Sequence, residues 1–143
     1  MKKSLSFLAL VLFSFFVISH TLEKDVWTNY YNDNQVQISF KNFRCLDVQN
    51  GTDKNYVLLQ VENKTNIKLK ISFKKTMWYD GKCQNCNNTG EEQNTTITLE
   101  PFEKIEGSCK SNKDLRIFSQ MNNQLTDTKL TKFDLNNILI TQQ

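Results

Sequence analysis

The sequence is poor in the residues on which most enzyme chemistry depends. Its 143 residues include one histidine, His20, one proline and four glycines. Without a histidine in the folded part, a serine or cysteine nucleophile lacks its usual base, and so few glycines leave no phosphate-binding loop. Carboxylate pairs such as Glu91–Glu92, and the set Glu100, Glu103 and Glu106, would suit glycoside hydrolysis, but we interpret them as solvated surface acids. We therefore expect no catalysis, no metal and no cofactor.

The longest apolar run lies at the N-terminus, and it is too short to cross a membrane. Lys2 and Lys3 precede an apolar stretch from Phe7 to Ile18, the pattern of a secretory signal peptide, whereas a bilayer core needs roughly 20 apolar residues. We expect cleavage after Ser19, with a retained N-terminal anchor as the alternative. Since no cysteine lies nearby, a lipid anchor is not expected. The sequence predicts a secreted or periplasmic protein without a stable membrane anchor.

A strong excess of one charge sign is also missing. Removal of residues 1–19 from the 143 leaves 124 residues with 16 basic and 15 acidic side chains, a net charge of +1. Nucleic-acid binding needs a concentrated basic surface. Only Arg44 and Arg116 could hold a phosphate with two parallel hydrogen bonds. We therefore expect no nucleic-acid partner.

Apolar residues recur at every second position along most of the remaining chain, which is the pattern of strands with one buried face. The clearest run, 67–73, alternates apolar residues with lysine and serine. Turn-forming pairs such as Asn50-Gly51 and Asp80-Gly81 separate the runs. The expected strands lie near residues 36–41, 56–61, 67–79, 97–99, 103–109, 115–121 and 133–140, the last with a bulge at Asn136–Asn137.

Seven short strands without a helical stretch between them predict an all-β fold. We expect one domain over residues 36–143, a small antiparallel two-sheet sandwich that is immunoglobulin-like in strand count. A tryptophan between two inter-sheet cysteines, the hallmark of antibody-type domains, is not clearly present, so the architecture is predicted and not the family. Residues 20–35 are polar but contain Trp27, Tyr30 and Tyr31, and form either a flexible arm or an extra edge strand.

The four cysteines carry the clearest chemical signal. Alternate connections of an antiparallel sandwich lie at opposite ends, so Cys45, Cys83, Cys86 and Cys109 should gather at one pole with the 80–94 loop. Four cysteines in an exported chain most often form two disulfides, and three pairings are possible. We favour Cys45–Cys109, worth roughly 4 kcal/mol, and Cys83–Cys86, worth about 2 kcal/mol.

The same cysteines permit two other readings. Cys83-Gln84-Asn85-Cys86 has the CxxC spacing of thiol redox proteins, which lower the pKa of one thiol at a helix N-terminus beside cations. Here the motif lies in an Asn-rich loop with no predicted helix. A four-thiolate zinc site would need a second CxxC, which the chain lacks. We keep thiol redox chemistry at Cys83 and Cys86 as the alternative function.

Aromatic residues beside the long loop are the binding candidates. Trp78 and Tyr79 could stack on sugar rings or anchor a protein partner, and the alternative is that one or both pack against the disulfides. We expect an exported, disulfide-stabilised, non-catalytic binding or accessory module whose protein or glycan partner binds at the pole carrying the 80–94 loop. A structural subunit of a surface assembly is a further alternative. Four Asn-x-Thr triplets match the N-glycosylation acceptor, and they begin at Asn50, Asn63, Asn87 and Asn94.

Overall fold

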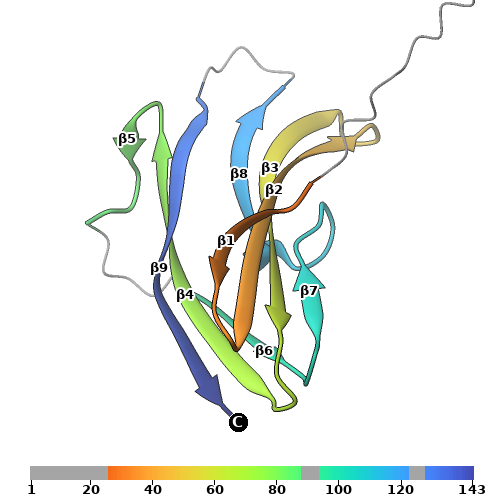
Figure 1. The fold of residues 1–143 in the computed structure, drawn as a ribbon. Coiled ribbons are helices and arrows are strands. Elements are labelled where there is room, and N and C mark those ends of the chain that lie inside the picture. The colour runs from red at the N-terminus through yellow and green to blue at the C-terminus, as the bar shows by residue number, and fades with distance from the viewer. Residues whose placement is uncertain (1–25, 88–93, 123–127) are drawn as a thin grey trace, which may run out of the picture.

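The computed structural model describes residues 26–87, 94–122 and 128–143, which form two antiparallel sheets packed face to face (Figure 1). The first sheet has five strands: β1 (Thr28–Asn32), β2 (Val36–Asp47), β3 (Thr52–Asn63), β7 (Lys104–Glu106) and β8 (Arg116–Met121). The second sheet has four strands: β4 (Leu69–Tyr79), β5 (Lys82–Cys83), β6 (Asn94–Leu99) and β9 (Leu130–Gln142). The described residues contain no α-helix, only a 3₁₀ turn over Lys113–Leu115.

The prediction of an all-β, two-sheet antiparallel sandwich is confirmed, and a strand lies at each of the seven expected places. Residues 28–32, within the segment expected to be an arm or an edge strand, form β1 and pair with β2. The bulge in β9 is also present: Ser72 pairs with Leu139, but Lys74 pairs with Asn136. Asn137, between these partners, has a positive φ of 54°.

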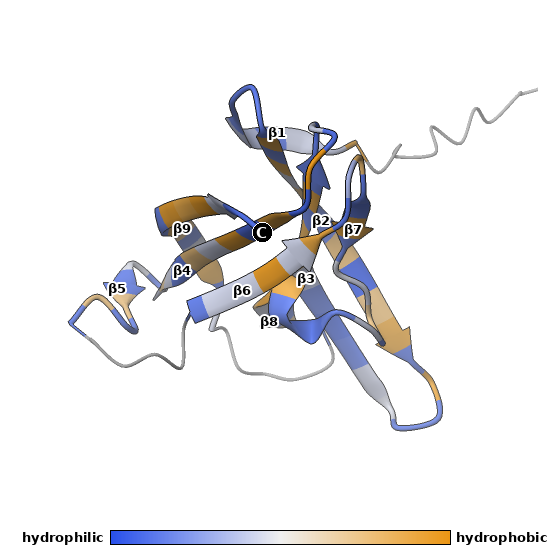
Figure 2. Ribbon diagram, turned by 90° about the horizontal axis from the view of Figure 1, so that it is seen from below, coloured by the Kyte–Doolittle hydropathy of each residue, from blue (hydrophilic) through white to orange (hydrophobic). Residues whose placement is uncertain are grey.

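The core consists of the inward positions of both sheets. Figure 2 shows hydrophobic stretches on β3 and β7 of one sheet and on β4, β6 and β9 of the other. Burying one such aliphatic side chain contributes about 1.5–3 kcal/mol, so this shared layer holds the sheets together. Its buried members are Val36, Ile38, Val57, Leu59, Val61, Leu69, Ile71, Phe73, Leu99, Leu115, Ile117 and Leu135.

The edge of the first sheet beside β3 is made by two strands in succession. β7 pairs with Gln60–Glu62 and β8 with Lys54–Leu58, so the chain leaves the sheet between them. Gly107 and Leu115 stand where this excursion departs and returns. A Cβ atom on residue 107 would lie 2.1 Å from the Leu115 carbonyl oxygen. The backbone at the start of the excursion can therefore approach the backbone at its end only because residue 107 is glycine.

Two disulfides are present, and they join the pairs favoured from the sequence. Cys45–Cys109 connects β2 to the excursion after β7, across the intervening strand β3. Cys83–Cys86 closes the short loop that follows β5. The predicted single cluster of four cysteines is not formed, because β2 belongs to the first sheet and β5 to the edge of the second, on opposite sides of the molecule (Figure 1).

Candidate binding cleft

The inner face of the first sheet changes from apolar to polar toward the β2–β3 hairpin. Side chains on one face of a strand follow a period of two. After Phe40, the next inward positions of β2 are therefore Asn42 and Arg44, and in β3 the positions beside the hairpin are Asn55 and Asp53. Polar groups at these positions do not pack against the second sheet as a dry core does. The sandwich therefore opens at this end.

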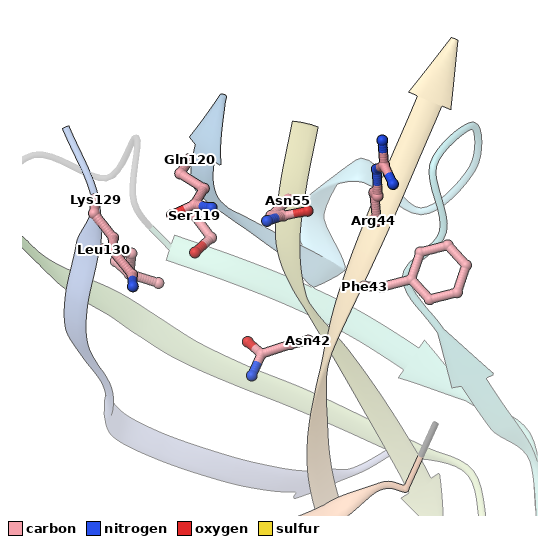
Figure 3. A pocket seen from close by; sticks show the side chains of 8 residues that line it. All are labelled: Asn42, Phe43, Arg44, Asn55, Ser119, Gln120, Lys129 and Leu130. Carbon is pink, nitrogen blue, oxygen red and sulfur yellow. The ribbon is translucent and has the colours of Figure 1, made fainter. Parts of the chain in front are cut away.

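A cleft of about 580 Å³ occupies the open end. In Figure 3 the side chains of Lys129 and Leu130 stand across from Asn55 and Arg44, while the ring of Phe43 turns away. Pockets of roughly 300–1,000 Å³ are typical of small-ligand sites. The lining residues are Asn42, Phe43, Arg44, Asn55, Ser119, Gln120, Lys129 and Leu130.

A hydrogen-bonded network fixes the hairpin side of the cleft. Arg44 donates from Nε and Nη2 to the two carboxylate oxygens of Asp53, at 2.8 and 2.5 Å. Asn122 donates to Asp53 Oδ1 at 2.9 Å. These donors, Arg44 first, lower the pKa of Asp53 to about 2 because they favour its charged form. Asn122 also exchanges hydrogen bonds of 3.0 and 2.9 Å with Asn55, so the Asn55 amide is held in place.

A smaller hollow of about 170 Å³ adjoins the cleft and shares Asn42, Ser119 and Leu130 with it. Its walls include the aromatic rings of Phe40 and Phe133, whose centroids lie 5.3 Å apart in an edge-to-face arrangement. Two aromatic rings therefore lie next to the polar cleft.

The described residues that line the cleft offer hydrogen-bonding groups for a ligand, and none of them is a carboxylate or a histidine. Amide side chains and hydroxyls both donate and accept hydrogen bonds. In the cleft the amides are those of Asn42, Asn55 and Gln120, and the hydroxyl is that of Ser119. Lys129 adds a positive charge, since Arg44 is already paired with Asp53. Among residues 26–87, 94–122 and 128–143, no three His, Cys, Asp or Glu side chains are grouped as metal ligands.

Tyr79, one of the two predicted binding residues, joins the sheets instead of lining the cleft. Its ring stacks on Phe118 of the first sheet with centroids 6.4 Å apart. Its hydroxyl donates to the Phe118 carbonyl oxygen at 2.7 Å. Burial raises the pKa of the Tyr79 phenol. This residue holds the two sheets at the end where the cleft opens.

Trp78, the second predicted binding residue, lies beside Cys83, its partner in the β4–β5 ladder. The indole is half-buried, and the Nζ of Lys132 stands 4.3 Å from the ring centroid. Trp78 and Tyr79 are both absent from the cleft lining, although β4 ends at the same pole (Figure 1).

The CxxC segment covers an opening along one edge of β4. On that edge, β6 pairs with Leu69–Lys74 and β5 with Trp78–Tyr79. Between them, Asn85 Oδ1 accepts from the Met77 N–H at 3.0 Å and Asn85 Nδ2 donates to the Lys75 carbonyl at 2.7 Å. Asn85 is only 5% exposed. The loop closed by the Cys83–Cys86 disulfide thus contains a side chain, that of Asn85, which makes the backbone hydrogen bonds that a neighbouring strand would otherwise make.

Sequence reasoning missed the cleft residues Asn42, Asn55, Ser119 and Gln120. The signal was present, because the period-two pattern of the strand at 36–41 extends to Asn42 and Arg44. Polar residues at positions that should face the core mark the place where a sandwich stops being packed.

No family model, curated protein or solved structure matches this chain. Within its described segments, no helix has the length and apolar character needed to span a bilayer.

Proposed function

We propose that the protein is an exported, non-catalytic binding module that holds a short glycan in the cleft between its sheets. The observation that carries this proposal is the set of neutral amides and a hydroxyl, from Asn42, Asn55, Gln120 and Ser119, that line an open cleft opposite Lys129. Export is supported by the two disulfides, which persist in oxidising compartments.

A glycan suits this lining better than a flat protein surface does. Each sugar hydroxyl both donates and accepts, and the amides of Asn42, Asn55 and Gln120 can satisfy both functions. Leu130 supplies an apolar contact for the C–H face of a sugar ring. The hydrogen bonds between Asn55 and Asn122 place one of these amides before the ligand arrives, which reduces the entropic cost of binding.

The geometry around the cysteines supports a structural role for them over a redox one. Cys83 lies in β5 at a sheet edge, and its disulfide with Cys86 encloses Asn85, whose buried side chain is hydrogen-bonded to β4. Reactive thiols at Cys83 or Cys86 in a titration of the native protein would favour the redox alternative instead.

The proposal is tested by glycan-array binding of the secreted protein and of three variants. Asn42→Ala and Lys129→Ala change the lining, and Lys110→Ala is the matched control on the excursion after β7. Loss of one well-placed hydrogen bond to a ligand weakens binding by about tenfold, so both lining variants should lose affinity and the control should not.

Absence of glycan binding, or equal binding by the wild type and both lining variants, would overturn the proposal. If the wild type instead captures a protein in pull-down experiments and the two lining variants do not, the cleft is a protein-binding site and the glycan assignment is wrong.

A further inference from the structure

The four Asn-x-Thr triplets stand in different structural surroundings. Asn50 lies in the β2–β3 turn, Asn63 ends β3 and Asn94 begins β6. The triplet that starts at Asn87 extends into residues 88–89, outside the described part of the chain. The acceptor atom in N-linked glycosylation is the side-chain Nδ2 of asparagine, so the surroundings of that atom decide which triplets a folded protein can carry as modified residues.

Asn63 uses its whole side-chain amide inside the fold. The residue is 1% exposed. Its Nδ2 donates both hydrogens, to the Ile67 carbonyl at 2.7 Å and the Glu100 carbonyl at 2.9 Å. Its Oδ1 accepts from the Thr65 N–H at 2.9 Å. A glycan on Nδ2 would replace one of these hydrogens and leave a buried carbonyl unpaired, so the folded protein cannot carry it.

Asn50 is exposed at the tip of the longest hairpin. Its Nδ2 donates a single hydrogen bond, to Asp47 Oδ2 at 2.8 Å. Substitution of the second hydrogen by a sugar leaves that bond intact. The turn itself is set by Gly51, which has a positive φ of 61°, so a glycan on Asn50 points into solvent without disturbing the backbone.

Asn94 is exposed at the start of β6, an edge strand of the second sheet. In an extended strand the side chains of Asn94 and Thr96 share one face, and both are exposed, whereas Thr95 between them is 2% exposed and faces the core. The side chain of Asn94 makes no hydrogen bond to another described residue. Its backbone lies opposite Lys74 in the ladder between β4 and β6.

We propose that Asn50 and Asn94 accept N-linked glycans when the chain passes through a eukaryotic secretory pathway, and that Asn63 does not. The donor is a lipid pyrophosphate-linked oligosaccharide. The bond between the anomeric carbon of the sugar and its phosphate oxygen breaks, and a bond from that carbon to Asn Nδ2 forms. Nδ2 loses one proton, and the lipid pyrophosphate leaves. No oxidant or reductant is required.

The two sites bear on which surfaces stay open. Thr52 of the Asn50 triplet lines a hollow of about 440 Å³ on the outside of the first sheet, beside Cys45–Cys109. Asn94 and Thr96 line another, of about 500 Å³, on the outside of the second sheet. The inter-sheet cleft contains no residue of these triplets. Glycans at Asn50 and Asn94 would therefore cover the outer hollows and leave the cleft accessible.

The test is secretion of the full chain from yeast behind a yeast secretion leader, in a Thr89→Ala background that removes the Asn87 triplet. Peptide N-glycosidase converts each occupied asparagine to aspartate, and peptide masses identify the sites. We expect two glycans in this background and one in each of Thr52→Ala and Thr96→Ala, which keep Asn50 and Asn94 but remove the acceptor triplet. Circular dichroism of each variant confirms that it is folded.

An unmodified Asn50 or Asn94 in the secreted protein overturns the assignment of that site. A glycan on Asn63 in protein that is folded by circular dichroism overturns the claim that the fold excludes it. Retention of both glycans in Thr52→Ala or Thr96→Ala would show that the sugars are attached elsewhere and would overturn the proposal.

Discussion

The side-chain carbonyl of Asn85 accepts a hydrogen bond from the backbone N–H of Met77 at 3.0 Å, inside the loop closed by Cys83–Cys86. The same amide donates to the Lys75 carbonyl at 2.7 Å. One buried side chain therefore satisfies a backbone donor and a backbone acceptor of β4 that lie between the residues paired with β5 and those paired with β6. The CxxC loop is held to β4 by this contact as well as by its disulfide.

Asn85→Ala should lower the free energy of unfolding by about 2 kcal/mol, because it leaves the Met77 N–H and the Lys75 carbonyl unpaired in a poorly solvated place. Urea denaturation measures the change. The control is Gln84→Ala, since Gln84 is exposed and contributes only its backbone N–H to Met77. Equal stability of the two variants would contradict this account.

The two disulfides should differ in their contribution to stability. Cys45–Cys109 closes a sequence separation of 64 residues and Cys83–Cys86 one of 3. The loop-entropy model assigns about 4 kcal/mol to the first and about 2 kcal/mol to the second. Denaturation of the two double Cys→Ser variants should therefore show the larger loss for Cys45 and Cys109, and the reverse order would refute the model for this fold.

The ion pair of Arg44 and Asp53 should make stability depend on acid pH. The folded-state pKa of Asp53 is about 2, below its usual 3.8. Its stabilisation is therefore complete above pH about 4 and is lost as the pH falls through about 2. Wild type should exceed Asp53→Asn in unfolding free energy at neutral pH, and the difference should shrink toward pH 2. A pH-independent difference would be the contrary result.

Tyr79→Phe should cost about 1 kcal/mol, because it removes the hydrogen bond to the Phe118 carbonyl but keeps the stacked ring. Glycan binding should be unchanged, since Tyr79 does not line the cleft. Tyr56→Phe is the matched control, as the Tyr56 hydroxyl has no hydrogen bond to a described residue. Thermal unfolding and array binding together check the prediction. A loss of binding without a loss of stability would indicate that Tyr79 contacts the ligand.

Among the described glycines, Gly51, Gly81 and Gly107, replacement of Gly107 by alanine should be the most damaging, with a loss of more than about 2 kcal/mol, because its Cβ would overlap the Leu115 carbonyl oxygen. Gly51→Ala meets no neighbouring atom but keeps a positive φ of 61°, so about 1 kcal/mol is expected. Denaturant midpoints that rank the two variants the other way would contradict the close approach.

The strands were predictable because each carries its own period-two pattern, whereas contacts between distant segments carry none. The run 67–73 identified β4, and the pair Asn136–Asn137 marked the bulge, from neighbouring residues alone. The stacking and hydrogen bonding of Tyr79 depend on Phe118, which lies 39 residues away. No local pattern encodes such a contact.

The cleft was missed for a different physical reason. The period-two pattern of its own strand places Asn42 on the inward face, but Asn55 looks like an ordinary surface residue until the register of β2 and β3 places it opposite Arg44. Strand ends could be located from turn residues, and this suggested a shared pole for the cysteines. Which sheet each end joined could not be deduced, because the sequence does not state where the chain crosses between sheets.

The bulge at Asn137 interrupts the exposed edge of β9, through which two copies of the protein could otherwise pair. β9 is a 13-residue strand at the edge of its sheet, and a regular edge of that length offers a row of backbone groups to a neighbouring chain. The left-handed turn of Asn137 breaks that row, and Tyr30 occupies part of it by accepting from the Leu135 N–H at 2.7 Å. Both features disfavour pairing of β9 with the edge strand of a second copy.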